Sequence, residues 1–224
     1  MSVELDHLVI VADSLEQGAA WCASSLGVEP GPGGRHALMG THNRLLRLGG
    51  AYAASYLEII AVDPAAAPPR RTRWFGIDDA ALRAAVKAAP RLVHWVARTS
   101  SLDDVRQRLV AAGFNPGPAV AAERDTPHGL LRWRITVPDD GRPLACGAVP
   151  TLIEWTGRHP TEAMPERGVE LLRVELGAMP PQAVDALALA AVPGVVVSDD
   201  PAAPPIRARL RCPRGELLLE GGCL

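Results

Sequence analysis

Apolar and polar positions along the chain switch repeatedly between the period of a strand and the period of a helix. The expected elements, in chain order, are a strand at 4–11, a helix at 14–27, strands around 36–39, 42–48 and 56–62, a short helix at 79–88, a strand at 91–97, a helix at 100–113 and strands at 130–137 and 151–155. Ser14 and Gly27 are the expected N-cap and stop of the first helix. The order strand, helix, then further strands occurs twice, which predicts two βαβββ modules.

The two halves also align residue by residue. Leu15 follows His7 by eight residues, as Leu102 follows His94, and the segment THNRLLRL resembles TPHGLLRW. The last strand of each half carries one glutamate among apolar residues. The predicted organisation is a first module at 1–62, a linker with a short helix at 63–90, a second module at 91–157 and a C-terminal segment at 168–224. We interpret this pattern as an internal duplication.

The C-terminal segment reads as strand, helix, strand, strand, which is typical of a third, incomplete module of βαββ type. The position that matches His7 is Arg173 or Val174, so the histidine pattern is absent there. We expect this segment to pack on the main sheet or to contact a second copy in a homodimer.

Composition narrows the class of protein. The 224 residues carry a formal charge of −2 without a basic stripe, which argues against a nucleic-acid partner. No apolar run reaches the roughly 18 residues of a membrane span, and the first residues lack the features of a signal peptide. The four cysteines form no Cys-x-x-Cys pair and are expected to be reduced thiols. A soluble cytoplasmic protein without a membrane partner is expected.

Strand alternation predicts where the duplicated polar residues point. Successive side chains in a strand face opposite sides, so His7 and Glu58 can share one concave surface, and His94 and Glu154 can join them. A buried carboxylate is costly unless it is paired or bound to a cation. Two histidines and two glutamates would supply the ligands of one divalent metal ion such as Zn, Ni, Fe, Mn or Co. The alternative is two separate His–Glu pairs with a structural role.

Several further residues are candidates for contact with a small-molecule substrate. Each also has a simpler interpretation. His42 and His128 would be exposed strand ends, Arg132 would be a solvated side chain, and Trp74 and Phe75 would pack the linker against the modules. Trp95 and Trp155 are assigned to the helix side of the sheet as core residues. The candidates are His42, His128, Arg132, Trp74 and Phe75.

The pattern DHLVIVADSLEQ…YLEIIAV…VHWVARTSSLDD…LIEW resembles the vicinal oxygen chelate superfamily (glyoxalases, bleomycin resistance proteins and dioxygenases), and most closely its glyoxalase-like domain group. The resemblance covers about residues 4–157. It implies an α+β fold in which paired βαβββ modules form a cupped, incomplete barrel. It also implies a metal held by His7, Glu58, His94 and Glu154, with Glu154, or else Glu58, as the catalytic base.

This resemblance favours a metal-dependent lyase or isomerase that acts on a small substrate with adjacent oxygens. Two alternatives stay open at this point. One is a non-catalytic protein that binds an antibiotic-like molecule in the same cleft. The other is an Fe(II) extradiol-type dioxygenase, which would use His7, His94 and Glu154 as a two-histidine, one-carboxylate site.

Overall fold

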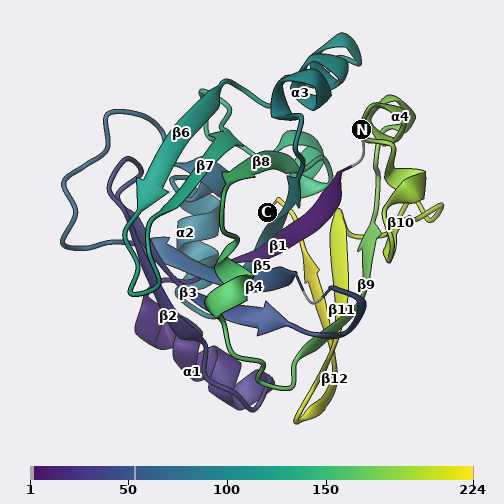
Figure 1. Cartoon of the computed structure of the whole chain (residues 1–224). Helices are drawn as coiled ribbons and strands as arrows, with labels where there is room; N and C mark the ends of the chain where they lie inside the picture. The colour runs from purple at the N-terminus through teal and green to yellow at the C-terminus, as the bar shows by residue number, and fades with distance from the viewer. Residues whose placement is uncertain (1–2, 53, 224) are drawn as a thin grey trace.

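A computed structural model describes residues 3–52 and 54–223 and shows a mixed α+β protein built on one branched, twelve-stranded sheet (Figure 1). The first half contains β1 (Glu4–Val11), α1 (Leu15–Ser25), β2 (Gly31–His36), β3 (Thr41–Leu48), β4 (Ser55–Val62) and α2 (Ala80–Val86). The second contains β5 (Arg91–Arg98), α3 (Leu102–Ala111), β6 (Ala119–Arg124), β7 (Leu131–Thr136) and β8 (Thr151–Thr156). The C-terminal segment contains β9 (Glu170–Leu176), α4 (Pro181–Leu187), β10 (Val195–Val197), β11 (Ile206–Cys212) and β12 (Gly215–Gly221).

The predicted duplication appears in the strand pairing. In the first half β1 pairs in parallel with β4, β4 pairs antiparallel with β3, and β3 pairs antiparallel with β2. In the second half β5, β8, β7 and β6 repeat this order with the same orientations. The fold class expected from the sequence, paired βαβββ modules with a further partial module, is therefore confirmed. The strands β2 and β6 differ from expectation. The strand expected around 36–39 is wrong beyond His36, because β2 covers Gly31–His36 and residues 37–40 form a turn, and β6 was not predicted.

The two modules are joined side by side through β1 and β5, which pair antiparallel. From this shared centre each module curves away, so that β2 and β6 become the edges of a cup and lie near each other. The register of the β1–β5 pair shifts between Leu5 and His7. Such a bulge changes the direction of neighbouring side chains, and here both Asp6 and His7 are enclosed.

Two apolar cores lie on opposite faces of the sheet. The outer core lies under α1 and α3 and contains Leu8, Ile59 and Trp95. The inner core fills one part of the cup and contains Val9, Ile60 and residues of the second module. Alternate residues of β1 and β4 enter the two cores, as strand alternation requires. Trp95 lies in the outer core, as expected.

The linker between the modules fills one end of the cup. Trp74 and Phe75 are buried against the inner core, and Leu82 and Val86 of α2 join them. Asp79 caps α2, because its carboxylate accepts hydrogen bonds from the backbone N–H groups of residues 81 and 82. The linker thus closes one end of the cup.

The C-terminal segment extends the sheet on the far side of β5 (Figure 1). Gly221 of β12 pairs with Leu92 near the start of β5, whereas Val96 to Arg98 of the same strand pair with β8. The sheet therefore branches along β5. The segment has the expected strands and helix, and in addition the short strand β10, which pairs in parallel with β9.

The helix termini follow the predicted signals. The Ser14 hydroxyl accepts a hydrogen bond from the backbone N–H of Gln17 at 3.1 Å, and Gly27 has a positive φ of 78°. Ser101 occupies the same position before α3 but makes no such side-chain bond. Among the described residues, the helices are all too short or too polar to cross a membrane.

Candidate functional site

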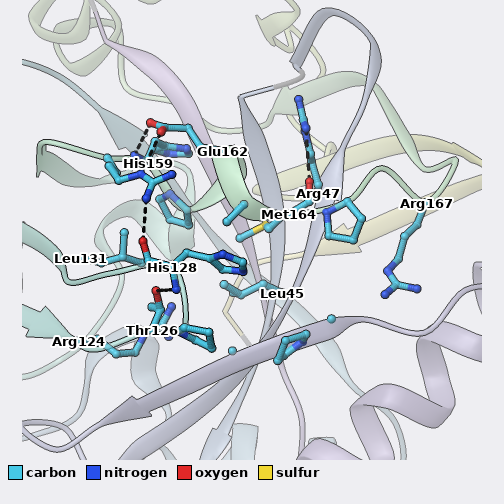
Figure 2. Close-up of a pocket in the computed structure, with 18 residues that line it drawn as sticks. Leu45, Arg47, Arg124, Thr126, His128, Leu131, His159, Glu162, Met164 and Arg167 are labelled. Carbon is cyan, nitrogen blue, oxygen red and sulfur yellow. Dashed lines mark hydrogen bonds and ion pairs between the residues drawn. The ribbon is translucent and has the colours of Figure 1, made fainter.

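The open end of the cup contains a cavity of about 250 Å³ (Figure 2). Both modules contribute to it, together with the segment that follows β8. Much of its wall is apolar, formed by Leu45, Leu131, Met164, Pro127, Pro160 and Pro165. Its polar lining includes four arginines, two histidines and one carboxylate, namely Arg47, Arg124, Arg158, Arg167, His128, His159 and Glu162. Such a lining suits a molecule with an apolar body and an anionic group.

A smaller cavity of about 30 Å³ lies deeper in the cup. Leu45, Arg124 and Pro160 line both cavities, so the two adjoin each other. The inner cavity has room for about two water-sized groups. Its polar wall contains His7 and Glu58, and Glu58 is the one carboxylate that lines it within residues 3–52 and 54–223.

A buried ionic triad forms the polar floor of the cup. The His7 Nδ1 lies 2.6 Å from the Asp6 Oδ1, and the His7 Nε2 lies 3.5 Å from the Glu58 Oε2. All three side chains are at most 7% exposed. Because two carboxylates flank one imidazole, the cationic form of His7 is the form that the site stabilises.

The titration of the triad follows from these contacts. Burial alone would lower the pKa of His7, but the hydrogen bonds and charges of Asp6 and Glu58 outweigh it and raise this pKa to about 9. Burial would raise the pKa of Asp6, but hydrogen bonds with His159 and His7 hold it well below its usual range. Burial also opposes the ionised form of Glu58, and His7 still keeps the Glu58 pKa below its ordinary value. At neutral pH the triad carries two negative charges and one positive charge.

A second layer of hydrogen bonds holds the triad. The Asn43 Nδ2 donates to the Glu58 Oε1 at 2.6 Å, and the Arg124 guanidinium donates to the Asn43 Oδ1 at 3.0 Å. On the other side, the Trp155 Nε1 donates to the Asp6 Oδ2 at 2.9 Å, and the His159 Nε2 lies 3.1 Å from the same oxygen. Each carboxylate is thus fixed by residues that also line the cavities.

The four predicted metal ligands do not meet at one point. Glu154 lies on the opposite face of β8, where it accepts a hydrogen bond from Arg134 at 3.1 Å, and it is 3.4 Å from the backbone N–H of Leu102 at the start of α3. Its neighbours Ile153 and Trp155 line the cup instead. The prediction that Glu154 faces the cup is therefore wrong, and so is the assignment of Trp155 to the helix side. The described part of the chain contains no group of three or more His, Cys, Asp or Glu residues placed to hold a metal.

The register of the strands explains the missing carboxylate. In the first module Val9 pairs with Glu58, and in the second the equivalent Val96 pairs with Thr151. Thr151, not Glu154, is therefore the structural counterpart of Glu58. Its hydroxyl lies 3.0 Å from the His94 Nε2, and its backbone N–H donates to the same nitrogen at 2.9 Å. The second module thus keeps the histidine, but the residue beside it is a threonine, Thr151, where the first module has the glutamate Glu58.

His94 occupies a different place from His7. It faces a small cavity of about 10 Å³, which it shares with Trp74, Phe75 and Thr151. Trp74 and Phe75 line both this cavity and the inner cavity at His7. Burial lowers the pKa of His94 to about 3, so it is neutral.

The predicted substrate contacts divide into two groups. Trp74 and Phe75 line the inner cavity, and His128 lines the outer one. His42 faces outward from β3, because its neighbour Asn43 takes the inward position. Arg132 is exposed and pairs with Glu123 at 3.2 Å. For His42 and Arg132 the structure therefore contradicts the substrate-contact interpretation and supports the simpler one, of a strand residue and an arginine that lie outside the cup.

Several residues of the site were not predicted. Asp6 adjoins His7 in the sequence, and that Asp-His pair was the available signal. Asn43 and Arg124 could not be found from the chain alone, because their roles depend on how β3 and β6 approach each other. Also unpredicted were His36, whose Nε2 lies 3.3 Å from the Asn43 Nδ2, and His159, which lies beyond the second module.

Residues 5–192 match the family described as Glyoxalase-like domain. This chain therefore belongs to the glyoxalase-like domain family, within the vicinal oxygen chelate superfamily. No curated protein matches the sequence.

Several solved structures resemble this chain at low sequence identity. A hypothetical protein from Staphylococcus aureus is 14% identical with a TM-score of 0.55, and the match covers 99% of this chain and 87% of that one. A methylmalonyl-CoA epimerase variant from Streptomyces coelicolor is 15% identical with a TM-score of 0.42, covering 70% and 100% of the two chains. The methylmalonyl-CoA epimerase from Mycobacterium tuberculosis is 16% identical with a TM-score of 0.37, covering 67% and 85%. The first likeness shows a shared fold, and no activity is taken from the epimerases.

Members of this superfamily commonly bind a divalent metal, but the donors here do not fit one. A metal ligand needs a free lone pair. The His94 Nε2 already accepts a hydrogen bond from the Thr151 backbone N–H, and His94 lines a different cavity from His7 and Glu58. Glu154 is paired with Arg134 outside the cup. The same placement does not form the two-histidine, one-carboxylate site of an Fe(II) dioxygenase.

Proposed function

We propose that this protein is an isomerase or lyase that binds a small organic molecule in the cup and moves a proton through Glu58. The observation that supports this most directly is a buried carboxylate, Glu58, at the wall of a small cavity that adjoins a larger, mostly apolar one. The outer cavity would hold the body of the substrate. The inner cavity would hold the reacting end, for which it has about the right room.

The chemistry of Glu58 favours a substrate that already carries an acidified proton. Its lowered pKa keeps the carboxylate in the basic form at neutral pH, but it also makes the carboxylate a weak base. A C–H beside a carbonyl, in a compound with adjacent oxygens, is acidic enough to suit such a base. The carbon gives its proton to a Glu58 oxygen, and the electron pair of the C–H bond moves into the enolate. Glu58 then returns the proton to the same carbon, or, in a hydroxyketone, to the adjacent carbon while the hydroxyl proton moves to the former carbonyl oxygen and the carbonyl changes place.

The neighbours of Glu58 support this role. His7 stays cationic beside the carboxylate because Asp6 compensates its charge, so a positive group lies close to the developing enolate. Tyr56 stacks on His7 with ring centroids 4.5 Å apart and keeps the imidazole in place. No metal is needed for any of these roles.

A direct test is solvent exchange at the carbon that gives up the proton. Hydroxyketones and 2-oxo acids would be incubated with the protein in D₂O, and the loss of the α-proton signal would be followed by NMR. We expect at least one compound to exchange faster with the wild type and to lose about 10²–10⁴-fold of that rate with Glu58→Gln. Asp103→Asn, which removes an exposed carboxylate outside the cup, is the matched control.

A second candidate function is binding without catalysis. It is favoured by the saturation of the triad, since both oxygens of Glu58 and both nitrogens of His7 already have partners. Compounds that bind in the cavity but show no exchange above background, with the wild type as with Glu58→Gln, would favour this binder over the enzyme.

A further inference from the structure

Arg124 is distinguished from the other arginines of the cup by its surroundings. It extends from the end of β6 and lines both the outer and the inner cavity. Its guanidinium donates one hydrogen bond to the Asn43 Oδ1 at 3.0 Å. Its Nε is buried without a hydrogen-bond partner, and no carboxylate lies within 4.0 Å of the guanidinium in the part of the chain that the structure describes.

An incompletely paired cation in such a place is unfavourable. The Arg124 side chain is part-buried, and burial lowers its pKa below the ordinary value. Buried charges in proteins are normally paired, and buried polar N–H groups are normally bonded. The site therefore has an unmet need for an oxygen acceptor that carries negative charge.

The path of Arg124 into the cup depends on glycine. A Cβ at Gly34 on β2 would lie 2.3 Å from the Arg124 Cδ. The guanidinium thus crosses the opposite edge strand where no side chain stands. It reaches the side-chain amide of Asn43. The Oδ1 of this amide accepts from Arg124 and its Nδ2 donates to Glu58, so the amide links the two residues.

Among the residues described, two of the other arginines of the outer cavity have a carboxylate partner, one does not, and none of the three lines the inner cavity as Arg124 does. Arg158 pairs with Glu162 at 3.4 Å, and Arg47 lies 3.7 Å from Glu166. Arg167 makes no ion pair through its side chain within residues 3–52 and 54–223, and it stands at the cavity edge in Figure 2. Together with Arg124 it leaves the cavity with a positive field, which attracts anions.

We propose that the cup binds a carboxylate with an apolar body and that Arg124 is the residue that holds the carboxylate group. This inference rests on the proposed function in that it uses the same two cavities as the ligand site. A carboxylate is planar, and the fork of a guanidinium can bind it through two parallel N–H···O bonds. The apolar body would lie against Leu45, Leu131 and Met164 of the outer cavity.

The test compares paired ligands that differ only in the charged group. Binding of 3-phenylpropanoate and hexanoate, and of 3-phenylpropan-1-ol and hexan-1-ol, would be measured by calorimetry at pH 7 and low salt. We expect each carboxylate to bind the wild type at least ~10-fold more tightly than its alcohol. With Arg124→Gln the carboxylates should lose about 30-fold or more of their affinity, and the alcohols less than about threefold.

Two further variants sharpen the comparison. Arg132→Gln is the matched control, because it removes an arginine on the adjacent strand that points away from the cup, and it should leave all four affinities within about twofold. Arg124→Lys keeps the charge but not the planar fork, so its loss should be intermediate. If Arg124→Gln fails to fold, the wild type and Arg124→Lys decide the question.

Several results would overturn the inference. These are equal binding of carboxylates and alcohols to the wild type, equal losses for both ligand types with Arg124→Gln, and no binding of either carboxylate. None of these outcomes depends on turnover, so a failure of the exchange experiment with Glu58 is separate. Conversely, exchange of uncharged hydroxyketones without any preference for carboxylates would overturn this inference and leave the proposed function intact.

Discussion

The substitution Asp6→Asn should destabilise the protein in a way that depends on pH. It keeps the size of the side chain but removes the negative charge closest to His7, at 2.6 Å. Breaking a buried ion pair by removal of one partner typically costs about 3–5 kcal/mol. This is a large part of the 5–15 kcal/mol that holds an ordinary domain folded. Trp155 and His159 also lose their carboxylate partner.

The sign of the pH dependence follows from the two shifted pKa values. The His7 pKa rises from 6.5 to about 9 on folding, which is worth about 3 kcal/mol at 1.36 kcal/mol per pKa unit. This stabilisation is complete below pH 6.5 and is lost as the pH rises through 9. The Asp6 pKa is lowered on folding, so its contribution is present above its ordinary value of 3.8 and is lost as the pH falls below it. The wild type should therefore be most stable between about pH 4 and 6.5 as far as this triad is concerned.

Urea unfolding followed by tryptophan fluorescence at pH 5.5, 7, 8.5 and 10 would measure both effects. The difference in the free energy of unfolding between the wild type and Asp6→Asn should be largest near pH 5.5 and shrink by pH 10, where His7 is neutral in both proteins. Groups that titrate elsewhere affect both proteins alike. Asp103→Asn, an exposed ion-pair partner, should cost at most about 1 kcal/mol at every pH. A difference for Asp6→Asn that is below 1 kcal/mol, or that does not change with pH, would refute the assignment of a charged triad.

Three further predictions follow from other parts of the structure. Ser14→Ala should lower the free energy of unfolding by about 1 kcal/mol, measured by thermal or urea unfolding, because it removes the N-cap of α1. Ser101→Ala should lower it little, because Ser101 makes no capping hydrogen bond, and equal losses for the two variants would contradict this. Gly34→Ala should weaken binding of 3-phenylpropanoate because its Cβ displaces Arg124, whereas Gly49→Ala, whose Cβ meets its nearest neighbours at 3.5 Å away from the cup, should not; unchanged binding by Gly34→Ala would count against the path of Arg124. Dialysis against a strong chelator should leave the melting temperature unchanged, since the predicted ligands do not converge; a lower melting temperature that added Zn²⁺ restores would show a metal site after all.

The sequence predicted those strands whose own side chains pack into a core. β1, β4 and β5 are nearly continuous runs of apolar residues, and their bounds follow from that pattern. β2, with the sequence GPGGRH, has no such pattern and is a strand because β3 pairs with it. β6 is likewise held in place by β7 and was missed. Strands that owe their form to a neighbour are not visible in local periodicity.

The site was predictable in its first half and not in its second. His7 and Glu58 face the cup as strand alternation indicates. In β8 both faces are buried, with Leu152 in the outer core and Ile153 in the inner one, so the apolar pattern does not tell which face holds Glu154. A change of one residue reverses every side chain of a strand. The pairing of Val96 with Thr151 determines which face of β8 holds Glu154, and this register cannot be predicted from the sequence alone.

The branching of the sheet also bears on how the protein avoids aggregation. β12 covers the part of β5 that β8 leaves free, so that the central strand offers no open edge at Leu92. The main strand path then ends at β10, which is only three residues long, and at β2, where Pro32 lacks an N–H and the register is interrupted. The edge of the branch, β6, lies near β2. Short strands, prolines and bulges make poor templates for a strand from another molecule. A sheet of this size can thus stay free of intermolecular pairing while one end of its cup remains open to solvent.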